Sequence, residues 1–174
     1  MLRAVGLLSV LAVACAHAPT SPSAQNDLQE RAQVALDNLR SFNSNLQPAL
    51  DQSAGYVVFP DAFEVAFLGG GGGGTGVVYQ QGRPIGYAEL NQASFGGEVG
   101  GQKFAEVIVV RDQKTLDEMR SGKFKIAGDA SAIISHTGTS KAFNVGENVL
   151  VFVQPISGAE VKASVIGQRV KLIF

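Results

Sequence analysis

The side chains best suited to catalysis or metal binding are few and far apart in this chain. It has two histidines and one cysteine, and His17 lies near the N-terminus while His136 ends a predicted strand. A zinc site needs several such ligands close together. Ser135 and His136 are adjacent, and adjacent residues of a strand point to opposite faces, which excludes a paired nucleophile and base. We therefore expect no catalytic residue, no metal site and no enzymatic activity.

Two glycine-rich stretches match phosphate-binding patterns only in part. Gly69–Gly74 satisfies GxGxxG, but Thr75–Gln80 then predicts a strand where a dinucleotide-binding fold needs a helix. The stretch Gly96–Lys103 has Gln102 where a phosphate-binding loop has lysine. Both stretches are therefore expected to be turns, or strands that pack too closely for side chains. No cofactor is expected.

Cys15 is suited to a different chemistry, the acylation of its thiol. It follows an apolar run, Ala4–Ala14, which comes after Arg3 and is too short to span a bilayer. A positive start, a short apolar core and small residues before the cut are typical of a secretory signal peptide. Residues 11–15, LAVAC, resemble the lipobox of bacterial lipoproteins, although Leu11 falls one place early. The pattern predicts a signal peptide over residues 1–14 and a lipid anchor on Cys15.

Ordinary secretory cleavage after Ala16 is the alternative, and it would leave a soluble periplasmic or secreted protein. Two observations favour acylation. Cys15 has no disulfide partner in the chain, and residues 16–26 are rich in Ala, Ser and Pro, as a flexible tether would be. Ala16 after the cysteine resembles the outer-membrane sorting signal. We therefore expect a tether over residues 15–26 and a location on the outer membrane, facing the periplasm.

Two helices are predicted in the domain that follows the tether. From Asp27, apolar residues recur at three- and four-residue spacing, at Leu28, Ala32, Ala35, Leu36, Leu39, Phe42 and Leu46. The polar face of this helix is acidic, which favours packing on the domain over binding to a membrane surface. A second, short helix is predicted over Asp112–Ser121, capped by Asp112 and ended by Gly122.

From Gly55 onward the apolar period falls to two, which predicts strands. These are Gly55–Pro60, Glu64–Leu68, Thr75–Gln80, Ile85–Leu90, Ala93–Gly100, Phe104–Arg111, Phe124–Ala127, Ala130–His136, Asn148–Val153, Glu160–Ile166 and Arg169–Ile173. Val149–Val153 is apolar on both faces and predicts a strand covered on both sides. Val170, Leu172 and Phe174 are predicted to share one face. The prediction is one mainly β (α+β) domain over residues 27–174, with antiparallel strands in a sandwich or barrel-like arrangement.

Charge is unevenly distributed along the chain. The net charge of −1 and pI of about 6.1 give no general attraction to nucleic acid. After residue 100, however, ten Lys and Arg residues face seven acidic ones. The candidates for contact with anionic lipid head groups are Lys123, Lys125, Lys162, Arg169 and Lys171. An ordinary solvated surface is the alternative for these residues.

Four blocks, in order, carry a family resemblance. They are residues 53–60 (SAGYVVFP) with the glycines up to Gly76, residues 94–110 around Gly96 and Gly97, residues 116–131 and residues 149–167. Together they resemble the SYLF domain, although Glu98 stands where that family often has Gln. The resemblance covers about residues 30–174. Eukaryotic members bind phosphoinositides or actin filaments, but their N-terminal helix is basic, so here the resemblance implies only lipid or membrane-surface binding.

The sequence thus predicts a lipid-anchored, periplasm-facing protein that binds lipid or membrane surfaces without catalysis. Its alternative is a structural lipoprotein that contacts another envelope protein and has no lipid ligand. Neither prediction identifies a protein partner.

Overall fold

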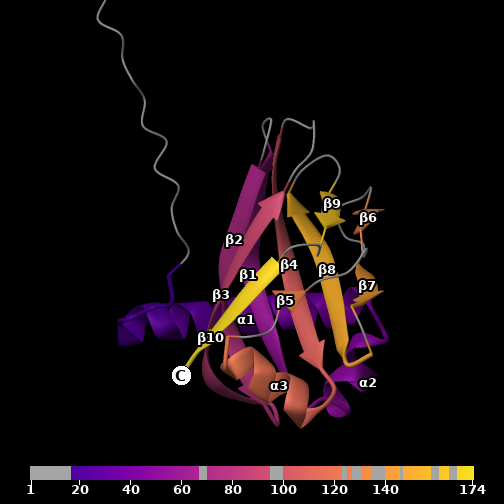
Figure 1. Ribbon diagram of the computed structural model, residues 1–174. Helices are drawn as coiled ribbons and strands as arrows, with labels where there is room; N and C mark the ends of the chain where they lie inside the picture. The colour runs from indigo at the N-terminus through magenta and orange to yellow at the C-terminus, as the bar shows by residue number, and fades with distance from the viewer. Residues whose placement is uncertain are drawn as a thin grey trace, which may run out of the picture.

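The described residues form mainly β-structure, as predicted, together with three helices (Figure 1). The computed structural model describes residues 17–66, 70–94, 100–122, 125–126, 131–134, 140–145, 147–157, 161–164 and 168–174. The helices are α1 (Pro22–Phe42), α2 (Leu46–Asp51) and α3 (Gln113–Arg120). The strands are β1 (Gly55–Ala66), β2 (Gly70–Gln80), β3 (Arg83–Ser94), β4 (Gly100–Val110), β5 (Lys125–Ile126), β6 (Ser131–Ile134), β7 (Lys141–Asn144), β8 (Val149–Ser157), β9 (Val161–Ser164) and β10 (Gln168–Ile173).

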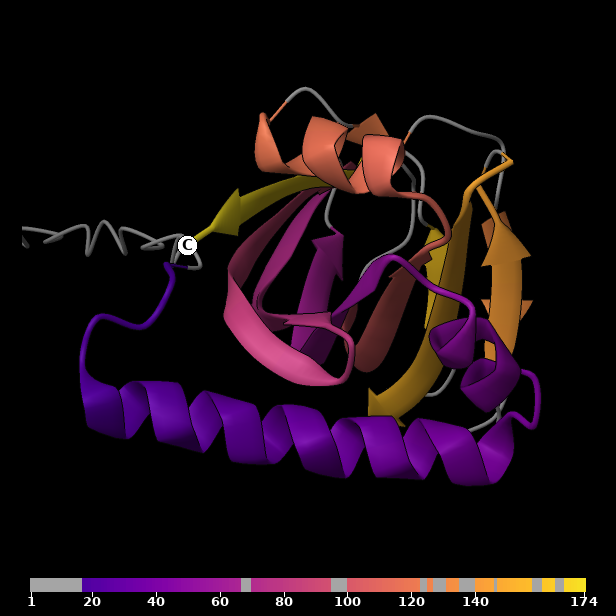
Figure 2. The same cartoon turned by 90° about the horizontal axis from the view of Figure 1, so that it is seen from below.

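In the described part of the chain, eight strands form one antiparallel sheet in the order β5-β10-β3-β2-β1-β4-β8-β7. Strands β6 and β9 pair separately. The large sheet curls into a barrel-like form, with α1 along one side and α3 across the other (Figure 2). We call the face that contacts α3 the inner face and the face covered by α1 the outer face. Both are apolar, so the domain has two hydrophobic clusters, one on each face.

A bulge in β1 accompanies this curvature. The register of β1 shifts between Phe59 and Ala62 against β4, and between Val58 and Phe63 against β2. Pro60 lies inside the shifted segment and has no N–H to donate to the ladder. A bulge bends its strand and increases the local twist. The strands predicted over Gly55–Pro60 and Glu64–Leu68 are therefore parts of one bent strand, which is described as far as Ala66; residues 67 and 68 lie outside the described residues.

The glycine stretch is strand, which is the second of the two predicted alternatives. Gly70–Gly76 form most of β2 and pair with β1 on one side and β3 on the other. The neighbouring backbone lies too close for side chains: a Cβ at Gly72 would lie 2.3 Å from the carbonyl oxygen of Phe63. β2 and β3 are joined by Gln81 and Gly82, whose φ angles of 53° and 74° suit a two-residue hairpin turn.

Helix α1 covers the outer face and begins five residues before the predicted start. Ser21 caps it by accepting a hydrogen bond from the Ala24 N–H, and Pro22 occupies its first turn. The first turn therefore overlaps the predicted tether, because a capping serine and a proline also have the composition of a linker. The apolar residues predicted to face the core are buried, except Phe42, whose side chain is 52 % exposed. Phe42 is the last residue of the helix, and its side chain lines an open groove beside the end of β8.

Helix α3 closes the inner face and matches its prediction closely. The Asp112 carboxylate accepts from the Thr115 N–H, and Gly122 ends the segment at a φ of +68°. Leu116 and Met119 are fully buried in the inner cluster. β8 is covered on both sides as predicted, because Val151 faces the inner cluster and Phe152 the outer one.

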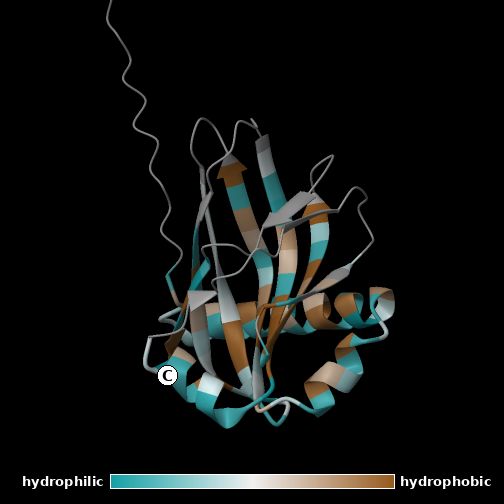
Figure 3. Ribbon diagram, turned by 45° about the vertical axis from the view of Figure 1, so that its right-hand side comes forward, coloured by the Kyte–Doolittle hydropathy of each residue, from teal (hydrophilic) through white to brown (hydrophobic). Residues whose placement is uncertain are grey.

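The hydropathy of the strands follows this two-sided packing, with brown and teal bands along the sheet (Figure 3). In β10, Gln168, Val170 and Leu172 are buried while Arg169 and Lys171 are exposed. Phe174 departs from the prediction, since its side chain is 63 % exposed. It follows the last residue of β10, and Arg120 of α3 lies over its ring without burying it. None of the described helices is both long and apolar enough to cross a membrane.

Candidate functional site

The five predicted head-group residues fall in different places. Arg169 and Lys171 are exposed on β10, and Lys125 is the register partner of Arg169 on the neighbouring strand β5. Lys162 belongs to β9 in the two-stranded sheet, opposite Ile133. Lys123 lies outside the described residues, as does Cys15. The topology therefore brings Lys125, Arg169 and Lys171 to one end of the large sheet, and it does not bring Lys162 there. We call these three residues the basic edge.

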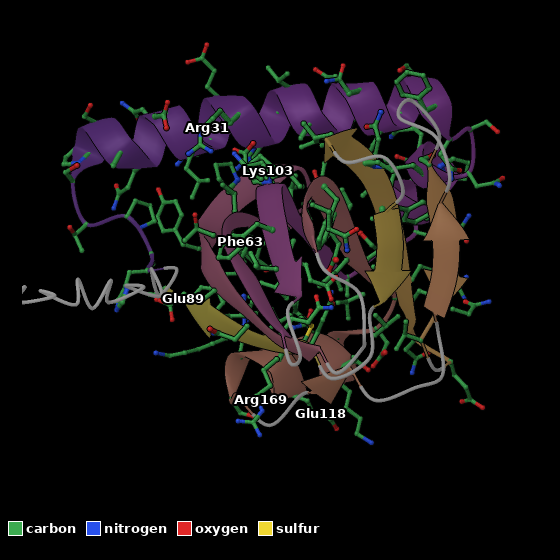
Figure 4. The ribbon with its side chains drawn as sticks, turned by 90° about the horizontal axis from the view of Figure 1, so that it is seen from above. Arg31, Phe63, Glu89, Lys103, Glu118 and Arg169 are labelled. Atoms are coloured by element: carbon green, nitrogen blue, oxygen red, sulfur yellow. The ribbon has the colours of Figure 1, made fainter. Side chains whose placement is uncertain are left out.

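Strand alternation positions the basic edge. Every second residue of β10 points into the apolar inner cluster, so the residues between them must point outward. Arg169 lies on the side of the molecule that carries α3, and Lys103 lies on the opposite side near α1 (Figure 4). The two cations are therefore on different surfaces, although both belong to the basic half of the sequence.

Glu89 of β3 joins the basic edge to the start of the described chain. Its side chain is only 15 % exposed, and its Oε2 lies 3.9 Å from the Lys171 Nζ. Its Oε1 accepts a hydrogen bond of 3.0 Å from the Ala18 N–H. Figure 4 shows Glu89 beside the segment that runs from α1 toward the N-terminus. One carboxylate therefore holds residue 18 next to the basic strand.

Arg120 and Phe174 extend this surface, and sequence reasoning missed both as site residues. The guanidinium carbon of Arg120, in the last turn of α3, lies 4.9 Å from the ring centroid of Phe174. The Arg120 Nη1 also lies 3.7 Å from the Asp117 Oδ1. An exposed cation–π contact of this kind contributes about 0.5–1 kcal/mol. Only the tertiary structure places the end of α3 beside the C-terminus, so no local pattern could have identified the pair.

The site is suited to binding an anion near an apolar phase. Its described residues include exposed cations and an exposed aromatic ring, and none of them forms a pair of nucleophile and base. In the described portion of the chain, no group of three His, Cys, Asp or Glu side chains is arranged to hold a metal ion.

A second surface feature lies between α1 and the end of β8. It is a groove of about 650 Å³ whose apolar lining includes Val34, Phe42 and Ile156. These are three of the five large hydrophobic side chains found exposed among the described residues. Its rim is acidic, with Asp27, Glu30 and Asp61. Arg31 pairs with Asp27 at 3.0 Å and also contacts Asp61.

Comparison with known proteins gives no match: no family model fits the chain, and no curated protein is significantly similar to it.

Proposed function

We propose that this protein is a lipid-anchored, non-catalytic envelope protein that applies its basic edge to anionic lipid head groups. The observation that carries the proposal is the double contact of Glu89, whose two oxygens meet the Ala18 N–H and the Lys171 Nζ. The N-terminal segment and the basic strand β10 are therefore adjacent (Figure 2).

Chain length then limits how far an anchor can be from this edge. Cys15 precedes Ala18 by three residues, and three Cα–Cα steps span at most about 11 Å. Acyl chains on Cys15 would enter the bilayer close to β3 and β10. The anchor would thus hold the basic edge at the lipid surface at a high effective concentration.

The energetics require such an anchor. A basic side chain near an anionic bilayer contributes about 1 kcal/mol, and the effect decays within a Debye length of about 10 Å at 0.1 M salt. Arg169, Lys171 and Arg120 alone would therefore bind weakly. In this proposal the acyl chains supply the attachment, and the basic edge orients the domain on the surface.

Vesicle co-sedimentation tests the orientation step. The mature chain carrying Cys15→Ser is mixed with vesicles of phosphatidylglycerol and phosphatidylcholine, or of phosphatidylcholine alone. We expect binding to the anionic vesicles at low salt only. Arg169→Ala/Lys171→Ala should lose most of it. The matched control, Lys103→Ala/Arg111→Ala, removes the same charge from other surface positions and should retain it. Equal losses in the two variants, or no binding at low salt, would refute the proposal.

The groove beside α1 favours a second candidate, contact with another envelope protein. Its apolar floor and acidic rim suit a segment that presents apolar side chains flanked by Lys or Arg. A photo-crosslinking residue at Val34 in intact cells should then give one defined adduct. The same residue at exposed Lys114, outside the groove, should not. Identical patterns from both positions would contradict this candidate.

A further inference from the structure

The inner face of the sheet carries a group of polar side chains that the proposed function does not use. Glu106 of β4 and Gln168 of β10 are 0 % and 1 % exposed, and Gln92 of β3 is 6 % exposed. In the sheet order, β10 and β4 are separated by β3, β2 and β1. A contact between Glu106 and Gln168 therefore crosses the interior of the curled sheet and joins strands that do not pair.

The hydrogen bonds of this group leave two atoms without partners. The Gln168 Nε2 donates to the Glu106 Oε2 at 3.0 Å and to the Gln92 Oε1 at 3.3 Å. This uses both of its N–H groups. The Glu106 Oε1 and the Gln168 Oε1 are buried and have no hydrogen-bond partner. When Glu106 is ionised, these two oxygens can only accept hydrogen bonds, so they cannot form one with each other.

A proton on the Glu106 Oε1 resolves this arrangement. A protonated carboxyl has one donor and one acceptor, and the edge of a primary amide that carries the C=O and the syn N–H has the complementary pair. The Gln168 Nε2 already donates to the Glu106 Oε2. A hydrogen bond between the two unpartnered oxygens, the Glu106 Oε1 and the Gln168 Oε1, would therefore complete a ring between the acid and the amide. The Glu106 hydroxyl would donate to the Gln168 Oε1.

The surroundings also disfavour an ionised Glu106. Among the described side chains on the inner face of β1, β3, β4, β8 and β10, the other titratable group is Glu64, which accepts a hydrogen bond of 2.6 Å from Gln102. Lys103, Glu89, Arg169 and Lys171 lie on outward positions of β4, β3 and β10, and α3 exposes its charged residues while burying Leu116 and Met119. Among the side chains that the structure describes, no cation therefore compensates a carboxylate buried at this position. Burial raises the pKa of Glu106 to about 7, although the hydrogen bond from Gln168 acts in the opposite direction.

We propose that Glu106 and Gln168 form a proton-dependent clasp that joins β4 to β10 across the inner face. With Glu106 protonated the pair is a closed ring with two hydrogen bonds. Loss of the proton leaves one hydrogen bond and a buried negative charge, so β10 is held less firmly. β10 pairs with β3 at six register positions but with β5 at only two, so the clasp adds a contact across the interior to a strand that is fully paired on one side only.

The protonation state is tested on the unaltered protein. The chain is labelled with ¹³C at the glutamate side-chain carboxyls and titrated by NMR, and the Glu106 resonance is identified by its absence in Glu106→Gln. We expect its midpoint near neutrality, displaced upward from the ordinary pKa of 4.5. A midpoint at the ordinary glutamate value would overturn the proposal without any variant having to fold.

The clasp itself is tested by hydrogen exchange of the β10 amides, corrected for the intrinsic rates. Between about pH 6 and 8 the protection of residues 168–173 should fall about tenfold in the unaltered chain. In Glu106→Gln an amide replaces the acid and still offers a donor and an acceptor, so the protection should not change with pH. The control Glu64→Gln should retain the fall. Equal pH dependence in the unaltered chain and in Glu106→Gln would refute the clasp.

Discussion

The ring of Phe59 lies against the backbone of Gly76 on the inner face of the sheet. A Cβ at Gly76 would lie 2.7 Å from the Phe59 Cδ1 and 2.7 Å from the carbonyl oxygen of Val58. Phe59 is fully buried in the inner cluster. The glycine strand therefore makes room for the largest fully buried side chain of β1.

Gly76→Ala should consequently destabilise the fold. The added methyl group meets both the ring of Phe59 and the main chain of Val58, and overpacking of this kind costs about 1–3 kcal/mol. Urea denaturation measures the loss. Gly101→Ala is the matched control, because a Cβ there meets nothing within 4 Å; its unfolding free energy should change by less than about 0.5 kcal/mol. Comparable losses in the two variants would show that β2 does not pack as described.

The glycines also show where sequence reasoning reached its limit. The run of glycines is compatible with turns and with a strand, because a residue without a side chain can adopt either backbone conformation. The choice depends on Phe63 and Phe59 in a neighbouring strand. By contrast, α3 was predicted almost to the residue, since Asp112 and Gly122 act within one turn of the helix that they bound. Local sequence signals thus predict helix caps and the alternation of buried and exposed residues in strands. They do not predict which residues pair between strands.

The same division applies to the candidate site. Alternation along β10 predicts that Arg169 and Lys171 share the outward face, and they do. The contact of Arg120 with Phe174 and the bond between Gln168 and Glu106 join residues far apart in the chain. Nothing in the sequence near Glu106 distinguishes it from a solvated strand residue. Only the sheet order shows that it is buried opposite an amide.

The packing of α1 gives a second prediction. Leu36 is 1 % exposed in the outer cluster, whereas Val34, on the same helix, is 56 % exposed. Leu36→Ala should lower the unfolding free energy by about 2–5 kcal/mol, because it removes buried methyl groups and leaves a cavity. Val34→Ala should change it by less than about 0.5 kcal/mol. Thermal or urea unfolding of both variants checks this, and similar losses would mean that α1 does not cover the sheet.

The buried carboxyl of Glu106 predicts how stability depends on pH. Its pKa is raised from 4.5 to about 7 in the folded protein, chiefly by burial. The folded state therefore binds more protons than the unfolded state between these values, so stability must fall as pH rises. The contribution of Glu106 to stability is fully present below the pKa of the unfolded state. It decreases as the pH rises through the pKa of the folded state, and it is absent above that pKa. The slope should approach about 1.4 kcal/mol per pH unit.

Urea denaturation of the unaltered chain and of Glu106→Gln over this range measures the difference directly. The variant carries no titratable group at residue 106, so its curve should lack the decline. The other titratable groups are the same in both proteins, so their effect on the unfolding free energy cancels in the difference between the two curves. Parallel curves would show that Glu106 is not the group responsible.

The mature N-terminus gives a further prediction and separates the two cleavage alternatives. If Cys15 is acylated, mass spectrometry of the protein from cell membranes should show diacylglycerol on an N-terminal Cys15. If cleavage instead follows Ala16, the mature chain begins with unmodified His17 and the anchor hypothesis is wrong.

Fractionation then separates the anchor from the basic edge. Cys15→Ser should move the protein from the membrane fraction to the soluble one, because the acyl chains provide nearly all of the attachment. Arg169→Ala/Lys171→Ala should remain in the membrane fraction, since two charges contribute only about 1 kcal/mol each. Its effect should be confined to the orientation of the domain, which can be followed by the protection of β10 from protease on intact vesicles. Release of this double variant from membranes would mean that the charges, and not the acyl chains, provide the main attachment.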